Sequence, residues 1–166
     1  RITPQMRRIT DPTAEVAEYE LVIGVTSPYV ALKDRRPYNL TFSVDTSGSM
    51  GGKAINNAKF ALTAIADGLR EGDIVSLVDW NTEQDILLDS HPIDGPNDSV
   101  FLGVINALNA GGGTNLEAGL RNAYNLANKN RTQGAINRVV LMSDGGANVG
   151  VTSADLIARQ ADDQEL

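Results

Sequence analysis

The apolar residues of this chain follow two periods, one typical of strands and one typical of helices. From about Tyr38 onward, short apolar runs predict strands at residues 39–44, 73–80, 84–90 and 137–142. The third of these is expected to be a short companion of the second. Amphipathic segments separate the strands, and this alternation predicts an α/β fold with a mostly parallel sheet.

Three amphipathic helices are expected between the strands. Their inward faces show three- and four-residue spacing and comprise Ile55, Ala58, Leu62, Ile65 and Leu69, then Phe101, Val104, Ile105 and Leu108, then Leu116, Leu120, Ala123, Tyr124 and Ala127. Asn97 or Asp98 can cap the second helix and Asn115 the third. A last helix is expected to begin at Thr152. The predicted fold is Rossmann-like and doubly wound, with helices flanking the sheet.

Residues 1–37 have a different pattern. Residues 1–14 are polar and interrupted by prolines, whereas residues 19–25 alternate as a strand would. The segment fits an entry strand or the edge of a neighbouring β element, and it fits a solvated arm equally well. We therefore divide the chain into an N-terminal extension, residues 1–37, and an α/β domain, residues 38–166.

Composition narrows the classes of function. The chain has 166 residues and a formal net charge of -7. Residues 1–36 hold six Lys/Arg against five Asp/Glu, so residues 37–166 hold eight against sixteen. This acidic balance argues against a nucleic-acid partner, which needs clusters of Lys and Arg. The absence of cysteine excludes disulfides and thiolate metal sites, and no apolar run approaches the ~18 residues of a membrane span.

Oxygen-bearing side chains follow the predicted strands at three places. Asp45, Ser47 and Ser49 come directly after the first strand of the domain, Thr114 follows three glycines, and Asp144 follows the last strand. Taken singly, these residues also fit helix caps, helix stops or turns. The carboxyl ends of parallel strands share one edge of a sheet, so the loops can converge there. Carboxylates and hydroxyls suit a hard divalent cation, and a metal site is predicted.

These residues resemble the metal-ion-dependent adhesion site of the von Willebrand factor type A domain and its integrin I-domain relatives. The motif is Asp-x-Ser-x-Ser, a Thr in a later glycine-preceded loop, and an Asp-Gly after a later strand. Asp45, Ser47, Ser49, Thr114 and Asp144 match it in order. The resemblance covers roughly residues 38–166. The flanking residues look most like those of bacterial members, including envelope-associated and secreted ones.

The resemblance implies a mechanism. Ser47, Ser49 and Thr114 would bind Mg²⁺ directly, with Ca²⁺ or Mn²⁺ as alternatives, while Asp45 and Asp144 would act mainly through waters. An Asp or Glu of a partner protein would fill the open position. In a low-affinity state Asp144 would bind the ion itself. The expected role is adhesion or assembly, and the expected location is extracytoplasmic, in the cell envelope, the periplasm or secreted, with the cytoplasm left open.

Two other classes of function are weaker. In one, the chain is a structural subunit or fragment of an assembly, and the metal only stabilises the loops. In the other, it is a Mg²⁺-dependent phosphatase or NTPase. A P-loop needs Gly where Ser47 stands and a hydroxyl where Ala54 stands. Aspartate-using phosphatases place a second carboxylate at the position of Ser47. We therefore predict that the chain is not an enzyme.

Three further expectations follow from single features. The family domain continues beyond the point where this chain stops at Leu166, so we expect a fragment that a second chain completes or that belongs to a longer protein. The strand at 139–142 would then be an unpaired apolar edge. Trp80 is expected to be a packing residue. His91, which precedes a proline in a loop, is expected to be exposed to solvent.

Overall fold

The structure, a computed structural model, describes residues 2–9, 18–25 and 34–145. It divides into two compact units, residues 1–35 and 36–166, and each is described by itself. The helix expected to begin at Thr152 lies outside the described residues.

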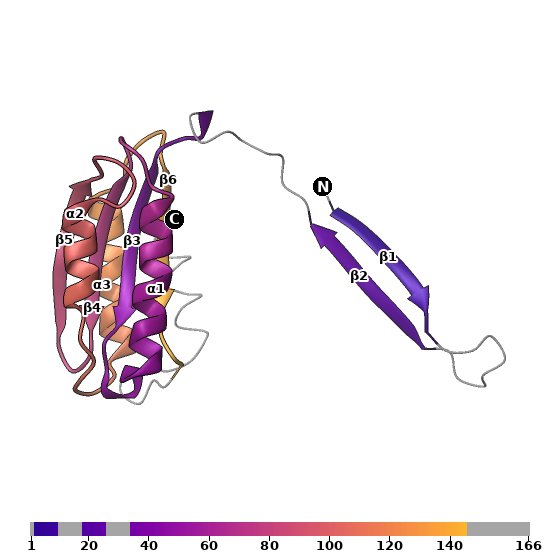
Figure 1. The fold of residues 1–166 in the computed structure, drawn as a ribbon, viewed down its shortest axis with the longest axis horizontal. Helices are drawn as coiled ribbons and strands as arrows, with labels where there is room; N and C mark the ends of the chain where they lie inside the picture. The colour runs from indigo at the N-terminus through magenta and orange to yellow at the C-terminus, as the bar shows by residue number, and fades with distance from the viewer. Residues whose placement is uncertain (1, 10–17, 26–33, 146–166) are drawn as a thin grey trace. The chain divides into compact units, whose positions relative to one another are not determined.

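The first unit contains an antiparallel hairpin of strands β1 (Ile2–Arg8) and β2 (Tyr19–Val25), seen in Figure 1. The strand predicted at residues 19–25 is confirmed, but β1 was missed because its residues are mainly polar. Its pairing with β2 explains its strand conformation, and on one face Arg7 forms a 2.7 Å ion pair with Glu20. The other face presents Met6, Leu21 and Ile23, which are 72%, 61% and 59% exposed. Whether residues 1–37 are the edge of a neighbouring β element or a solvated arm stays a prediction.

The second unit is built on a four-stranded sheet. Its strands are β3 (Tyr38–Asp45), β4 (Ile74–Trp80), β5 (Gln84–Pro92) and β6 (Ile136–Met142), in the order β5-β4-β3-β6. Strand β3 runs parallel to both β4 and β6, whereas β5 is antiparallel to β4. The prediction of a mostly parallel sheet is confirmed. Within the described residues β6 lies at the edge of the sheet.

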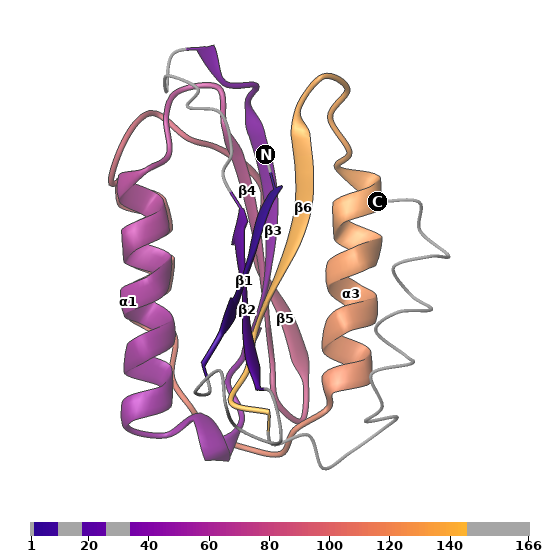
Figure 2. The ribbon, with the colours of Figure 1, turned by 90° about the vertical axis from the view of Figure 1, so that its right-hand side faces the viewer.

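Helices cover both faces of this sheet. A single 3₁₀ turn, η2 (Gly48–Met50), precedes α1 (Lys53–Asp67); α2 (Ser99–Ala107) and α3 (Leu116–Lys129) follow later in the chain. Figure 2 shows the sheet between α1 and α3. Helix α2 packs on the same face as α1. The doubly wound arrangement is therefore confirmed. In the described segments no helix has the length and apolar character needed to cross a membrane.

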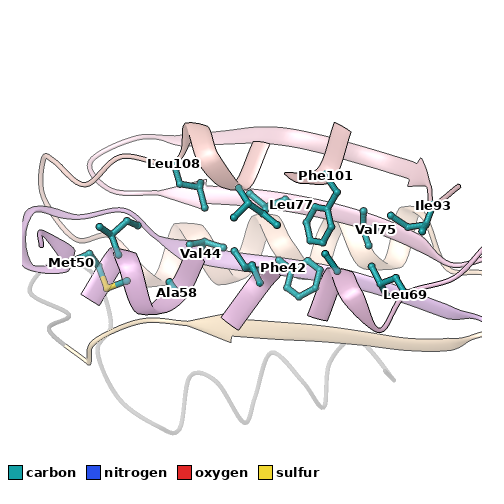
Figure 3. Close-up of a cluster of buried hydrophobic side chains, with 14 residues drawn as sticks. Phe42, Val44, Met50, Ala58, Leu69, Val75, Leu77, Ile93, Phe101 and Leu108 are labelled. Atoms are coloured by element: carbon teal, nitrogen blue, oxygen red, sulfur yellow. The ribbon is translucent and has the colours of Figure 1, made fainter. Parts of the chain in front are cut away.

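The main core lies between the sheet and helices α1 and α2. Phe42 of β3 stacks on Phe101 of α2, with ring centroids 5.5 Å apart, and Figure 3 shows both rings among aliphatic side chains. Leu62 and Phe101 are fully buried, as their spacing predicted, and Ile65 packs against the same cluster. This core fixes α1 and hence the loop that joins it to β3.

Trp80 organises the opposite face of the sheet. Its ring is fully buried, and its Nε1 donates a 3.0 Å hydrogen bond to Ser43 Oγ. Helix α3 passes over the ring at Gly119, where an added Cβ would clash with the indole. The packing role predicted for Trp80 is confirmed. The glycine allows α3 to lie close to β4. This close packing fixes the position in space of the N-terminus of α3.

His91 corrects an expectation. Its side chain is 19% exposed, not solvated, and its Nε2 lies 2.9 Å from Asp98 Oδ1. Asp98 also accepts hydrogen bonds from the backbone N–H groups of Val100 and Phe101 and so caps α2. The sequence offered both Asn97 and Asp98 as caps, and Asp98 is the cap. His91 is drawn inward because β5 extends through Pro92 and places its ring beside this carboxylate.

Replacing Gly119 by Ala is expected to destabilise the domain by about 1–3 kcal/mol, because the new methyl group enters the space of the Trp80 ring. The matched control is Gly103→Ala in α2, where nothing lies within 4 Å of the added Cβ. That change is expected to stabilise by about 0.5–1 kcal/mol through helix propensity. Urea denaturation measures both. Equal effects of the two substitutions would contradict the close packing of α3 on Trp80.

Asp98 is expected to make stability depend on pH. Burial acts to raise the pKa of Asp98, but hydrogen bonds from Phe101, His91 and Asp94 outweigh it and hold the pKa below its ordinary value. The stabilisation is therefore complete above the unfolded pKa of about 3.9 and is lost as the pH falls through the folded value. Asp98→Ala should lower the free energy of unfolding by about 1–2 kcal/mol at neutral pH. Urea denaturation of both proteins at neutral and acidic pH should show this difference shrinking; a constant difference would refute the assignment.

Candidate metal site

Two of the loops predicted to carry the site are joined directly at one edge of the sheet. Because β3 and β6 are adjacent and parallel, Asp45 at the end of β3 lies beside the residues that follow β6. Ser143 Oγ donates a 2.8 Å hydrogen bond to Asp45 Oδ2. Asp144 is the next residue in the chain. The strand pairing therefore brings the first and last parts of the motif together across 98 positions of sequence.

Hydrogen bonds connect four of the five predicted residues. Asp45 Oδ1 accepts a 2.9 Å bond from the backbone N–H of Ser47. The hydroxyl oxygens of Ser47 and Ser49 are 3.0 Å apart, and Ser49 Oγ donates to Asp144 Oδ1 at 3.4 Å. Ser47, Ser49 and Asp144 are thus linked through their side-chain oxygens, and Asp45 is linked to Ser47 through the backbone N–H.

The loop of Thr114 is anchored to the same place by its backbone. Gly48 N donates to Gly112 O at 3.0 Å, and Gly111 N donates to Thr46 O at 2.8 Å. Thr114 itself is only 2% exposed. No hydrogen bond within the described part of the chain joins its hydroxyl to the other four residues. The structure brings the three loops together, with Thr114 beside the cluster rather than bonded to it.

The donor set fits a hard divalent cation. It consists of oxygens alone, from two carboxylates and three hydroxyls. Neighbouring ligands of an octahedral Mg²⁺ at about 2.1 Å lie about 3 Å apart. The 3.0 Å separation of the Ser47 and Ser49 hydroxyls agrees with adjacent ligand positions. Among the described residues no group of three or more His, Cys, Asp or Glu could hold a metal ion.

The predicted site residues differ in burial: the buried ones form the floor of the candidate site, and the exposed ones form its rim. Asp45, Ser47 and Thr114 are buried, whereas Ser49 and Asp144 are exposed. Asp45 is held at the floor by bonds to both of its carboxylate oxygens. An ion at this position would have protein oxygens below it and solvent or a ligand above it. The site is therefore open on one side.

Sequence reasoning missed several residues that support the site. Ser143 follows β6 and orients Asp45, and Thr46 contacts the end of β4 through both its backbone and its hydroxyl. The turn at Asn81 and Thr82 contacts the Thr114 loop. Ser143 could have been found because it precedes Asp144 at the strand end. The strands predicted at 73–80 and 84–90 leave a turn at 81–83, but nothing in the sequence pattern shows that this turn contacts the Thr114 loop, because these contacts depend on the position of β4.

Asp79 places a second carboxyl group near the first loop. Thr46 Oγ1 donates to its Oδ2 at 3.4 Å, while its Oδ1 is buried without a hydrogen-bond partner. Burial, and then the negative charge of Asp85, raise the pKa of Asp79 above its ordinary value. Asp79 therefore contacts the first loop through Thr46 and is not one of the residues of the motif.

The fold and the site together define a class of protein: a doubly wound α/β domain with oxygen-bearing loops at the carboxyl ends of its parallel strands. A sequence model of the von Willebrand factor type A domain matches residues 40–147. The chain belongs to this family. The resemblance drawn from the motif is confirmed, and domains of this family commonly bind a divalent metal.

Related sequences come from bacteria and animals. The chain is 38% identical over 114 residues to the uncharacterized protein YfbK of Escherichia coli, an alignment that covers 68% of this chain and 20% of that protein. It is 28% identical over 130 residues to inter-alpha-trypsin inhibitor heavy chain H3 of Homo sapiens, covering 73% of this chain and 14% of that protein. The matched region is thus a small part of each relative.

Solved structures agree on the fold. The von Willebrand factor domain of the type V pili tip protein Mfa5 from Porphyromonas gingivalis is 25% identical, with a TM-score of 0.56, covering 68% of this chain and 39% of that chain. A von Willebrand factor type A protein from Catenulispora acidiphila is 18% identical, with a TM-score of 0.60, covering 97% and 37%. Mfa5 is described as a type V pili tip protein.

Proposed function

We propose that residues 38–166 form a divalent-metal-dependent protein-binding module used in adhesion or assembly. The ion, Mg²⁺ with Ca²⁺ or Mn²⁺ as alternatives, would be held by Asp45, Ser47, Ser49, Thr114 and Asp144. A partner protein would contribute an Asp or Glu. The observation that carries the proposal is the hydrogen-bonded cluster of oxygens where β3 and β6 end side by side.

The chemistry of the residues favours binding of a carboxylate. A divalent ion supplies positive charge, and neutral hydroxyls in contact with it leave that charge largely uncompensated. Asp45 accepts hydrogen bonds from Ser47 and Ser143. These bonds orient its carboxylate, so direct contact with the ion is not required. Ser49 and Asp144 stand at the exposed rim, where a partner side chain can approach.

The same contacts argue against a purely structural role for the metal. The first loop is tied to the Thr114 loop by Gly48–Gly112 and Thr46–Gly111 backbone bonds, and to the last loop by Ser143. These bonds hold the loops together through protein atoms alone. A metal is therefore not needed to hold the loops together, which supports a binding module rather than a structural subunit.

The relatives support an extracytoplasmic location. The Mfa5 domain, which is 25% identical to this chain, belongs to a pili tip protein. We propose that this module also acts outside the cytoplasm, in the cell envelope or as part of a secreted protein.

Metal binding tests the site. Titration of the 166-residue chain with Mn²⁺, with free ion measured by electron paramagnetic resonance, should give one saturable site that Mg²⁺ displaces. Ser47→Ala and Thr114→Ala should each weaken binding by at least about tenfold, because each removes a ligand. Thr63→Ala removes an exposed hydroxyl on α1 and serves as the matched control. Unchanged affinity in Ser47→Ala and Thr114→Ala would refute the site.

Partner binding tests the function. The immobilised chain should retain proteins from a native envelope or secreted fraction in Mg²⁺ and release them in EDTA, since a bridging ion is required. Thr114→Ala should lose this retention while its melting temperature stays near that of the wild type. A large fall in melting temperature on metal removal, with retention unaffected by EDTA, would support the structural role instead.

A further inference from the structure

The turn between β4 and β5 has a fixed shape of its own. Asn81 N donates to Glu83 O at 2.9 Å, and Asn81 Oδ1 accepts from Glu83 N at 3.1 Å. These two bonds close the turn at residues 81–83 independently of the metal-site loops. None of the three residues belongs to the metal-site motif.

The turn accepts two hydrogen bonds from the residues on either side of Thr114. The backbone N–H of Gly113 donates to Thr82 Oγ1 at 2.7 Å, and the backbone N–H of Asn115 donates to Asn81 O at 3.0 Å. The residue before Thr114 and the residue after it are thus both held by the turn. Thr114 cannot shift along its loop without lengthening one of these bonds.

The same segment holds the first loop. Thr46 N donates to Trp80 O at 2.9 Å, and Asn81 Nδ2 donates to Thr46 Oγ1 at 3.3 Å. Thr46 stands between Asp45 and Ser47 in the motif. Residues 80–82 therefore form hydrogen bonds with both the loop of Ser47 and the loop of Thr114.

The glycines before Thr114 allow this close contact. An added Cβ at Gly112 would lie 3.0 Å from Thr82 Oγ1 and 3.3 Å from Asn81 Oδ1, and one at Gly113 would lie 3.2 Å from Thr82 Oγ1. Gly112 also has a φ of +77°, which favours glycine. The loop is thus shaped to lie against the turn.

We propose that Thr82 is a positioning residue for the metal site, which holds Thr114 at its ligand position through the hydrogen bond from Gly113. The proposal rests on the proposed function, since it assumes that Thr114 binds the ion. Thr82 itself touches no metal. Its side chain is exposed, so its replacement leaves the core intact, and its effect should reach the ion only through Thr114.

The test compares Thr82→Val, which keeps the shape and removes the acceptor, with Thr82→Ser, which keeps the acceptor. In Mn²⁺ titrations of the full chain, Thr82→Val should weaken binding by about tenfold, the usual effect of losing an outer partner of a ligand. Thr82→Ser should stay within about twofold of the wild type. Thr63→Val on α1 is the matched control and should leave affinity unchanged.

A spectroscopic measurement separates positioning from general stability. Luminescence lifetimes of bound Eu³⁺ in H₂O and D₂O count the waters on the ion. Thr82→Val and Thr114→Ala should each raise this count, because water replaces the threonine hydroxyl. Melting temperatures should stay near that of the wild type. A Thr82→Val protein with wild-type affinity and water count, beside a Thr114→Ala protein that binds weakly, would overturn this proposal and leave the metal site standing.

The double variant tests the route of the effect. If Thr82 acts through Thr114, adding Thr82→Val to Thr114→Ala should cause little further loss of Mn²⁺ affinity. A full additional loss would show that Thr82 acts elsewhere and would overturn the positioning role. Wild-type affinity in Thr114→Ala, or absence of Mn²⁺ binding by the wild type, would overturn the proposed function together with this proposal.

Discussion

The parallel pairing of β3 with β6 is the interaction on which the site depends. It aligns the strand that ends at Asp45 with the strand that ends just before Ser143, so that the two loops leave the sheet at the same edge. The Ser143–Asp45 hydrogen bond is a direct consequence. A slip of two residues in this register would move the two loops apart by about 7 Å, which is more than a hydrogen bond or a shared ion can span.

The third loop reaches the site by a different route. Helix α3 is packed on the Trp80 ring at Gly119, and this packing determines where the residues before the helix lie. The turn after β4 then holds the loop by hydrogen bonds on each side of Thr114. Trp80 and the turn that follows it therefore link the core of the domain to the metal-site loops.

The distribution of charge is consistent with a site for cations. The first loop has one buried aspartate, Asp45, tied by hydrogen bonds at both oxygens, and behind it lies Asp79, whose pKa is raised by burial and by Asp85. The hydroxyls of Ser47 and Ser49 are neutral and lie 3.0 Å apart, and Ser49 contacts the carboxylate of Asp144. In the proposed site, this arrangement would leave positive charge of a bound ion available to an external carboxylate, as recognition requires.

Much of the fold could be predicted from the sequence, because it depends on local periodicity. The spacing of apolar residues located strands β3 to β6 and the three described helices. Because Asp45 and Asp144 follow predicted strands and Thr114 follows three glycines, their loops were predicted to meet at one edge of the sheet. Strand β1 was missed because its pairing with β2 outweighs its polar composition, and His91 was placed wrongly because its burial comes from Asp98 in a neighbouring helix cap.

The sequence by itself determined which residue types stand at each strand end, because strand and helix periods and motif order are properties of neighbours in the chain. Only the tertiary structure decided how these residues are supported. The bonds from Ser143 to Asp45, from Asn81 to Thr46 and from Gly113 to Thr82 join segments separated by 31 to 98 positions. Such contacts exist only once the sheet is assembled, since each needs two strand ends or a turn and a loop to meet at hydrogen-bond distance.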